Sequence, residues 1–212
     1  MKVVDMDKWK RKEHFNFFKA FDYPHFNLCA NVDITAFLGY IKEKKYPFFL
    51  SSVYATYKVA NHIKEFRYRI RGEQVIEHEY VDPAVTIMND DGVFNFCTIP
   101  YEHTLSAFLQ AGQQEIDKAK KNISIADEEE RDDLIYMTSI PWVSFTNIMH
   151  PIHMNPVDSV PRIAWGKYFT DGDKVMLPLS IQAHHALMDG MHVGLYYEQI
   201  QAFFDHPEKY MK

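Results

Sequence analysis

Three glycine turns, each between two runs of β-forming residues, constrain the fold of this chain more than any other feature of its sequence. Gly72 separates FRYRI from EQVIEHEYV, Asp91-Gly92 separates AVTIM from VFNFC, and Asp171-Gly172 separates IAWGKYF from KVMLPLSIQA. Glycine accepts the positive φ angles of tight turns, so each pair of runs predicts a β-hairpin. In the last run the odd-numbered residues from Val175 to Ala183 are apolar, which is the period of a β-strand.

Helical patterns lie between these hairpins. Apolar residues recur at helical spacing in residues 34–46, behind the capping acid Asp33, and again in about 49–64, 104–120 and 191–204. Helices and strands that interleave in this way predict an α/β fold in which a mixed β-sheet is covered by helices. The sequence has no repeat and no linker-like segment, so we expect residues 1–212 to form a single domain.

Charge and composition exclude several classes of protein. The chain has 23 Lys and Arg against 29 Asp and Glu, a net charge of −6, which argues against a nucleic-acid partner. No apolar run is long enough to span a membrane, and the charged N-terminus does not resemble a signal peptide, so we expect a cytoplasmic protein. Two cysteines exclude a disulfide framework. The acidic run 126–133 is interpreted as a solvated surface segment.

The densest polar cluster is QAHHALMDGMH, residues 182–192. A histidine at the end of a strand can expose a ring nitrogen to a cleft, where a neutral imidazole can accept a proton from a hydroxyl group. Asp189 precedes Gly190 and a helical run, which suits a helix cap. No GxSxG, GxGxxG or GxxxxGK[ST] motif is present, so hydrolase and nucleotide-binding interpretations lose their main support.

Other interpretations of these residues stay open on the sequence alone. His184 fits a hydrogen-bonded core position, and Asp189 fits a plain helix cap. A metal site is conceivable from His184, His185, Asp189 and His192, or from His150 and His153, although no HExxH spacing supports either, and we expect no metal. The aromatic residues fit either an apolar pocket or an ordinary core.

HHALMDGMHV resembles the HHxxxDG signature of the chloramphenicol acetyltransferases, and other segments resemble that family in the same order. These segments are WKRKEHFNFF, VDITAF, Phe66-Arg67, VDP at 81–83, IPWVSFTN at 140–147 and GKYFTDGDKVMLPLSIQ. The resemblance covers nearly the whole chain and implies the fold of the CoA-dependent acyltransferases. It also implies an O-acetyltransferase that uses acetyl-CoA as cosubstrate and acts as a homotrimer, with the site between subunits.

The resemblance implies a role for each matching residue. His185 would be the general base, and His184 would be structural. Asp189 would pair with Arg11 and steady the turn. Thr138, with Ser139 beside it, stands where the family has a serine whose hydroxyl group stabilises the oxyanion, so a hydroxyl donor is kept.

The resemblance also implies where the two substrates bind. Trp142 and Tyr168 match positions near the pantetheine arm of CoA. On the acceptor side, Phe18 replaces a tyrosine and Ala164 replaces a threonine, so two polar groups that discriminate between acceptors are missing. The aromatic residues expected at the acceptor pocket are Phe17, Phe18, Phe26 and Phe94.

Three functions therefore follow as hypotheses. The first is acetylation of a chloramphenicol hydroxyl group. The second is the same acetyl transfer to a different hydroxylated acceptor. The third is a non-catalytic protein of the same fold that binds a hydrophobic ligand or a metal.

Overall fold

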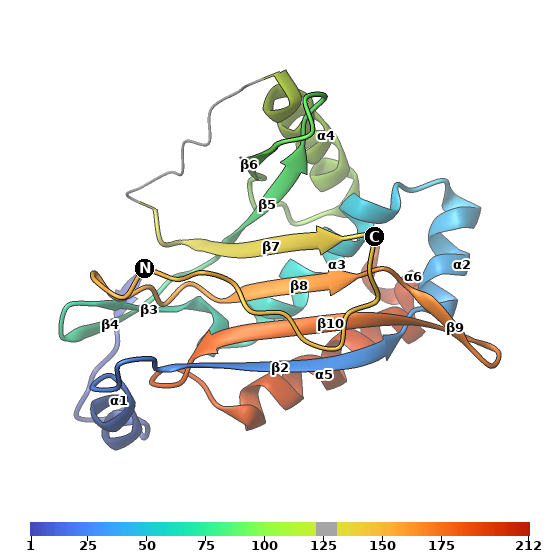
Figure 1. Ribbon diagram of the computed structural model, residues 1–212. Helices are drawn as coiled ribbons and strands as arrows, with labels where there is room; N and C mark the ends of the chain where they lie inside the picture. Colours follow the sequence, from blue (N-terminus) through green and yellow to red (C-terminus); the bar gives the residue numbers. More distant parts are fainter. Residues whose placement is uncertain (122–130) are drawn as a thin grey trace.

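A seven-stranded sheet organises the molecule in a computed structural model, which describes residues 1–121 and 131–212 (Figure 1). Its strands are β2 (His25–Asp33), β5 (Asp82–Met88), β6 (Phe94–Thr98), β7 (Leu134–Ile140), β8 (Arg162–Gly166), β9 (Phe169–Asp171) and β10 (Lys174–His184). The order β2-β10-β8-β7-β5-β6 is parallel at β8-β7-β5 and antiparallel elsewhere, and β9 pairs with the start of β10. The prediction of a mixed sheet is confirmed.

The three predicted hairpins form around their glycines. Gly72, Gly92 and Gly172 have φ angles of 59°, 76° and 58°, which a residue with a Cβ rarely adopts. Gly92 joins β5 to β6, and Gly172 joins β9 to β10. Gly72 lies in a separate small sheet, in which β4 (Gln74–Glu77) is the middle strand between β1 (Lys2–Val3) and β3 (Tyr68–Arg71).

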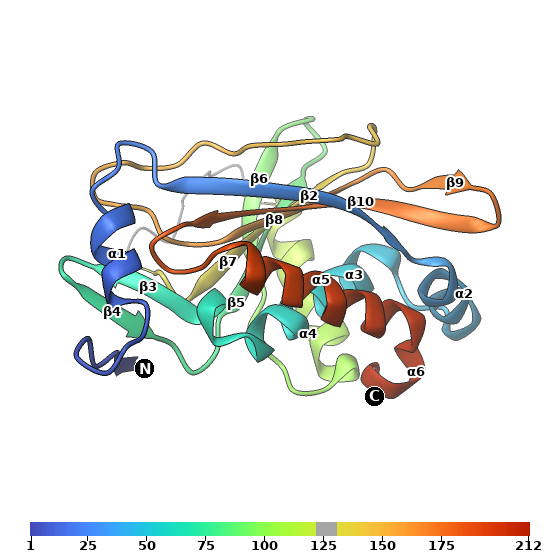
Figure 2. The same cartoon turned by 90° about the horizontal axis from the view of Figure 1, so that it is seen from below.

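Helices cover one face of the large sheet. Figure 2 shows α3, α4 and α5 together on this side, while the segment between β7 and β8 crosses the opposite side. The helices are α1 (Lys12–Phe18), α2 (Thr35–Lys44), α3 (Phe48–His62), α4 (Leu105–Lys121), α5 (Gly190–Asp205) and α6 (Pro207–Tyr210), with a 3₁₀ helix at Lys64–Arg67. The four predicted helices correspond to α2, α3, α4 and α5. Asp33 lies just before α2, and its carboxylate accepts hydrogen bonds from the backbone and hydroxyl of Thr35.

From Leu177 on, strand β10 is buried on both faces, which the alternation of its sequence did not predict. Leu177, Leu179 and Ile181 belong to the main hydrophobic core beneath the helices. Ser180 and Gln182, on the opposite face, are only 2 % and 1 % exposed. The polar face is therefore covered by other protein groups, which are the loop residues described below.

The end of the acidic run forms ion pairs with other residues of the chain, which the interpretation as a solvated surface segment did not predict. Residues 126–130 lie outside the described residues. At the end of the run, however, the Asp132 carboxylate receives hydrogen bonds from Arg71, 2.6 and 2.7 Å long, and lies 2.9 Å from His78. Asp133 pairs with Arg131 at 2.8 Å. These carboxylates hold the chain at the entrance to β7.

None of the helices within residues 1–121 and 131–212 is long and apolar enough to cross a membrane.

Candidate active site

The turn that carries the histidine pair, residues 184–190, is fixed on both sides by backbone contacts. The His185 N–H donates to the Pro24 carbonyl oxygen at 2.7 Å, and the Arg11 guanidinium donates to the His185 carbonyl oxygen at 3.2 Å. The His185 ring stacks on Phe18, with ring centres 3.9 Å apart and planes at 6°. We name His185, Phe17, Phe18 and Phe26 the histidine cluster.

The contacts of the His185 ring select its tautomer. Its Nδ1 atom lies 3.2 Å from the Met188 carbonyl oxygen, which can only accept a hydrogen bond. The proton of the neutral ring therefore sits on Nδ1, and the lone pair of Nε2 is available. This is the arrangement that a general base requires.

His184 lies in a different environment from its neighbour. It is 1 % exposed, its Nδ1 accepts a hydrogen bond from the Ala186 N–H at 3.2 Å, and its ring lies 5.0 Å from that of His25. Burial lowers the pKa of His184 to about 3 and that of His25 to about 4. Both rings are therefore neutral at physiological pH, and the geometry of His184 is that of a packed structural residue.

The buried pair predicts that stability falls as the pH drops below 6.5. In the unfolded chain both rings take up protons near their ordinary value of 6.5, whereas in the folded chain they stay neutral down to about pH 4. The unfolded state then binds more protons, so acid favours it. We expect the urea midpoint of unfolding to fall between pH 7.5 and pH 5.0.

A matched variant isolates this effect. His184→Asn keeps an acceptor for the Ala186 N–H but cannot titrate, so its loss of stability over the same pH interval should be smaller than that of the wild type. Equal pH dependence in both proteins would show that His184 does not cause it.

Asp189 caps helix α5 and also forms an ion pair, so both sequence interpretations hold at once. Its carboxylate pairs with Arg11 and accepts a hydrogen bond from the Met191 N–H at 3.0 Å. It also lies 2.8 Å from His192 Nδ1, whose Nε2 is 3.6 Å from Glu65. Burial opposes ionisation, but the hydrogen bond from Arg11 and the charges of His192 and Arg11 together lower the pKa of Asp189.

Removing either partner of this pair should destabilise the protein. The Arg11 and Asp189 side chains are 13% and 30% exposed, so we expect a loss of about 1–3 kcal/mol, between the values for surface and fully buried pairs. Asp189→Asn keeps a cap and should match Arg11→Ala, whereas Asp189→Ala loses the cap too and should cost about 1 kcal/mol more. Urea unfolding of the three variants at pH 7 measures this order.

The pH dependence of the pair is a second check. Because the folded pKa of Asp189 lies below its ordinary value of 3.8, the contribution is present above that pH and is lost as the pH falls through the folded pKa. Three variants with wild-type stability would contradict a structural ion pair.

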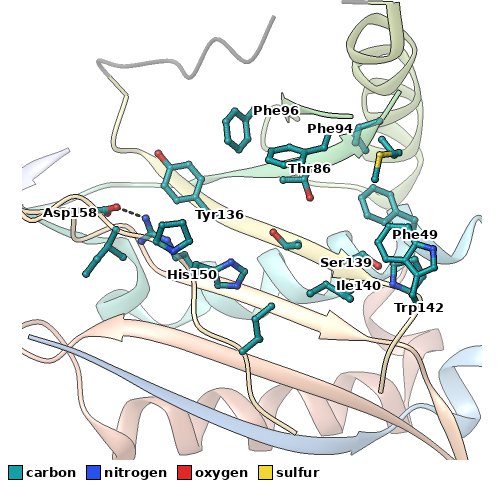
Figure 3. Close-up of a pocket in the computed structure, with 18 of the residues that line it drawn as sticks. Phe49, Thr86, Phe94, Phe96, Tyr136, Ser139, Ile140, Trp142, His150 and Asp158 are labelled. Atoms are coloured by element: carbon teal, nitrogen blue, oxygen red, sulfur yellow. Dashed lines mark hydrogen bonds and ion pairs between the residues drawn. The ribbon is translucent and has the colours of Figure 1, made fainter. Parts of the chain in front are cut away.

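A cavity of about 730 Å³ lies on the face of the sheet opposite the helices (Figure 3). Thr138 lines it from β7, on the same face of that strand as Tyr136, while Ile135 and Met137 face the core. Most of the wall is apolar. Phe94 and Trp142, expected in the acceptor and CoA sites respectively, both line this cavity.

Two further expected site residues, Ala164 and Tyr168, lie outside the cavity lining. Ala164 is 1 % exposed and pairs with Thr138 in the sheet register, but it is buried rather than part of the lining. Tyr168 packs against Phe48, with ring centres 5.7 Å apart, and does not belong to the described lining. Ser139 also borders the cavity.

The expected site is therefore divided within one chain. Phe17, Phe18 and Phe26 accompany His185 in the histidine cluster, and His185 is not among the described residues that line the cavity. Thr138, Phe94 and Trp142 lie in the cavity.

The polar end of the cavity was missed by the sequence interpretation. Tyr136, His150, Asp158 and Arg162 gather there from β7, β8 and the segment between them. On the sequence alone, His150 is a candidate only for a metal site. Within the part of the chain that the structure describes, no group of three or more His, Cys, Asp or Glu side chains could hold a metal ion.

Comparisons with known proteins agree over almost the full length. The family model described as chloramphenicol acetyltransferase matches residues 1–201. A chloramphenicol acetyltransferase from Proteus mirabilis is 31% identical over 206 residues, 96% of this chain and 94% of that protein. One from Escherichia coli is 30% identical over 206 residues, 96% of this chain and 93% of that protein.

Solved structures give the same result for the fold. A chloramphenicol acetyltransferase superposes with a TM-score of 0.89 at 28% identity, covering 96% of this chain and 99% of that chain. A dihydrolipoamide acetyltransferase from Azotobacter vinelandii superposes with a TM-score of 0.69 at 15% identity, covering 94% of this chain and 88% of that chain, which indicates a shared fold only.

Proposed function

This chain belongs to the chloramphenicol acetyltransferase family and is an acyltransferase, and we propose that it transfers the acetyl group of acetyl-CoA to a hydroxyl group of chloramphenicol. One observation carries the proposal: the Nδ1 atom of His185 faces the Met188 carbonyl oxygen at 3.2 Å, so Nε2 is free to accept a proton. The ring is held against Phe18 and its backbone is anchored at both ends, so its position is fixed before substrate binds.

The reaction follows from these groups. His185 Nε2 removes the proton from the acceptor hydroxyl as its oxygen attacks the carbonyl carbon of the thioester. Negative charge develops on the carbonyl oxygen, which accepts a hydrogen bond from the Thr138 hydroxyl group. When the tetrahedral intermediate collapses, the bond from carbon to sulfur breaks, and the imidazolium of His185 returns the proton to the CoA thiolate.

We place the active site between chains of a homotrimer, in which His185 of one copy enters the cavity of the next. The division of the site within one chain supports this arrangement. The side chains around the cavity support it too, because Phe94, Phe96 and Trp142 are 44%, 37% and 68% exposed, as expected of residues that a second copy covers. In this assembly each copy of residues 1–212 acts as one domain.

The choice of acceptor has a second candidate, a different hydroxylated compound. Phe18 and Ala164 lack the polar groups that the family resemblance places there, and the cavity instead carries His150 and Arg162 at its polar end. Acetyl transfer itself does not depend on these residues, so the chemistry is the same for either acceptor.

Release of CoA thiol from acetyl-CoA tests the proposal directly. The purified protein should release thiol in proportion to added chloramphenicol and should do so only slowly without it. Thiol release with other alcohols but not with chloramphenicol would favour the second acceptor. No release with any hydroxylated acceptor, from a folded protein that binds acetyl-CoA, would support a non-catalytic ligand-binding role.

A further inference from the structure

The loop that carries His150 is tied to the sheet at several points. The Asn27 side-chain amide donates to the Asn147 side chain at 2.6 Å. The Gln182 side-chain amide holds His150 on both sides, because its Oε1 accepts from the His150 N–H at 2.7 Å and its Nε2 donates to the His150 carbonyl oxygen at 3.2 Å. Gln182 is only 1 % exposed. The backbone of His150 is therefore fixed to β10, the strand that ends at the histidine turn.

The His150 side chain lies in the cavity, as Figure 3 shows. No residue within 1–121 or 131–212 forms a hydrogen bond with its imidazole. Burial, and then the charge of Arg162, lower the pKa of His150, so the ring is neutral at physiological pH. A neutral imidazole has one donor and one acceptor nitrogen, and both are available to a ligand here.

The charged groups beside His150 neutralise each other. Arg162 and Asp158 form an ion pair, drawn as a dashed line in Figure 3, and both side chains are 9% exposed. The guanidinium also donates to the Val160 carbonyl oxygen at 2.9 Å and lies 5.2 Å from the centre of the Tyr136 ring. This end of the cavity is polar but carries no net charge. A charged ligand group placed here would lose its hydration without gaining a partner of opposite charge.

We propose that His150 is a specificity-determining residue, whose imidazole forms a hydrogen bond with an uncharged polar group of the acceptor. The favoured acceptors carry a hydroxyl, carbonyl or nitro oxygen on an apolar frame, in addition to the hydroxyl group that is acetylated. The fixed backbone of His150 limits where its ring can lie, so a ligand that offers no partner leaves the ring nitrogens of a partly desolvated imidazole unpaired. The inference rests on the proposed function, whose acceptor it describes.

Steady-state kinetics with His150→Leu tests this role. Leucine keeps an apolar side chain in the cavity but removes both nitrogens, so KM for chloramphenicol should rise by about 2- to 12-fold, the value of one neutral hydrogen bond. KM for acetyl-CoA and kcat should stay within about twofold, because the lost contact is made equally in the ground and transition states. His150→Gln, which retains a donor and an acceptor, should recover most of the affinity.

Two comparisons make the test specific. A simple arylalkanol, which has only the reacting hydroxyl group, should show the same KM with wild type and His150→Leu. His206→Leu is the matched control, because His206 lies at the exposed end of α5 and the variant should behave as wild type. Binding of chloramphenicol without acetyl-CoA, followed by the fluorescence of Trp142 and the other tryptophans, provides a readout independent of turnover.

The outcomes separate this inference from the proposed function. An unchanged or lower KM for chloramphenicol in His150→Leu, with wild-type turnover intact, overturns the role of His150 and leaves the acetyltransferase in place. A rise in KM of the same size for the simple arylalkanol also overturns it, since leucine would then weaken binding through its shape and not through a lost hydrogen bond. Absence of acetylation by the wild type would instead contradict the proposed function.

Discussion

Replacing His185 with alanine should lower kcat for acetyl transfer by a factor of about 10²–10⁴, the usual contribution of a general base. The lone pair of Nε2 is available because Nδ1 faces the Met188 carbonyl oxygen, and without the ring the acceptor hydroxyl has no group to take its proton. The side-chain contacts that are lost include the stack on Phe18, the packing against Phe26 and the hydrogen bond to the Met188 carbonyl oxygen. Thiol release at saturating concentrations of both substrates measures kcat, and circular dichroism shows whether the variant is folded.

The neighbouring histidine is the matched control. His184→Ala removes a ring that is 1 % exposed and packs against His25, so it should lower the thermal midpoint of unfolding more than His185→Ala does. The molecules that remain folded should keep most of their turnover. If His184→Ala is folded and inactive while His185→Ala turns over normally, the base has been assigned to the wrong histidine.

Local features of this fold could be predicted from the sequence because they depend on backbone chemistry within a few residues. Gly72, Gly92 and Gly172 mark turns whose φ angles are positive, so the hairpins followed from three residues. The bounds of α5, Gly190–Asp205, differ from the prediction of 191–204 by one residue at each end, since the apolar spacing and the cap at Asp189 are both local signals.

The cavity could not be predicted in the same way, because its wall comes from segments far apart in the chain. Phe94 lies in it while Phe17 and Phe18 lie with His185, and nothing in an aromatic residue's type indicates which surface it will face. The missed residues His150 and Arg162 meet only through the path of the segment between β7 and β8. Gln182 fixes this segment by a hydrogen bond with His150, a residue 32 positions away in the chain.

The division of the site also has a physical origin that a single sequence does not reveal. Each strand position is set by pairing within one sheet, and His185, just past the end of β10, is not among the described residues that line the cavity. The expectation that a second copy completes the site comes only from the family resemblance. The exposed aromatic side chains around the cavity agree with that expectation, but their exposure could be known only once the chain was folded.

Thr138→Val should lower kcat by a factor of about 10²–10³, the usual cost of losing one oxyanion donor. Valine has nearly the same shape and the same preference for a strand, so β7 and its pairing of Thr138 with Ala164 should remain intact. Thr138→Ser keeps the hydroxyl group and should be close to wild type. Near-normal turnover of Thr138→Val, together with very low turnover of Ser139→Ala, would indicate that Ser139 and not Thr138 is the donor.

Mixing the two inactive variants tests whether both groups belong to one shared site. A trimer assembled from His185→Ala and Thr138→Val chains contains sites in which an intact His185 of one copy meets an intact Thr138 of the next. Random assembly from equal amounts makes about a quarter of the sites complete, as follows from a cyclic interface in which each copy supplies one half of every site. We therefore expect co-refolded protein, sedimenting at three times the 25.0 kDa mass of the chain, to regain about a quarter of wild-type turnover. Turnover that stays at the level of the separate variants would place base and donor in the same chain and contradict the shared site.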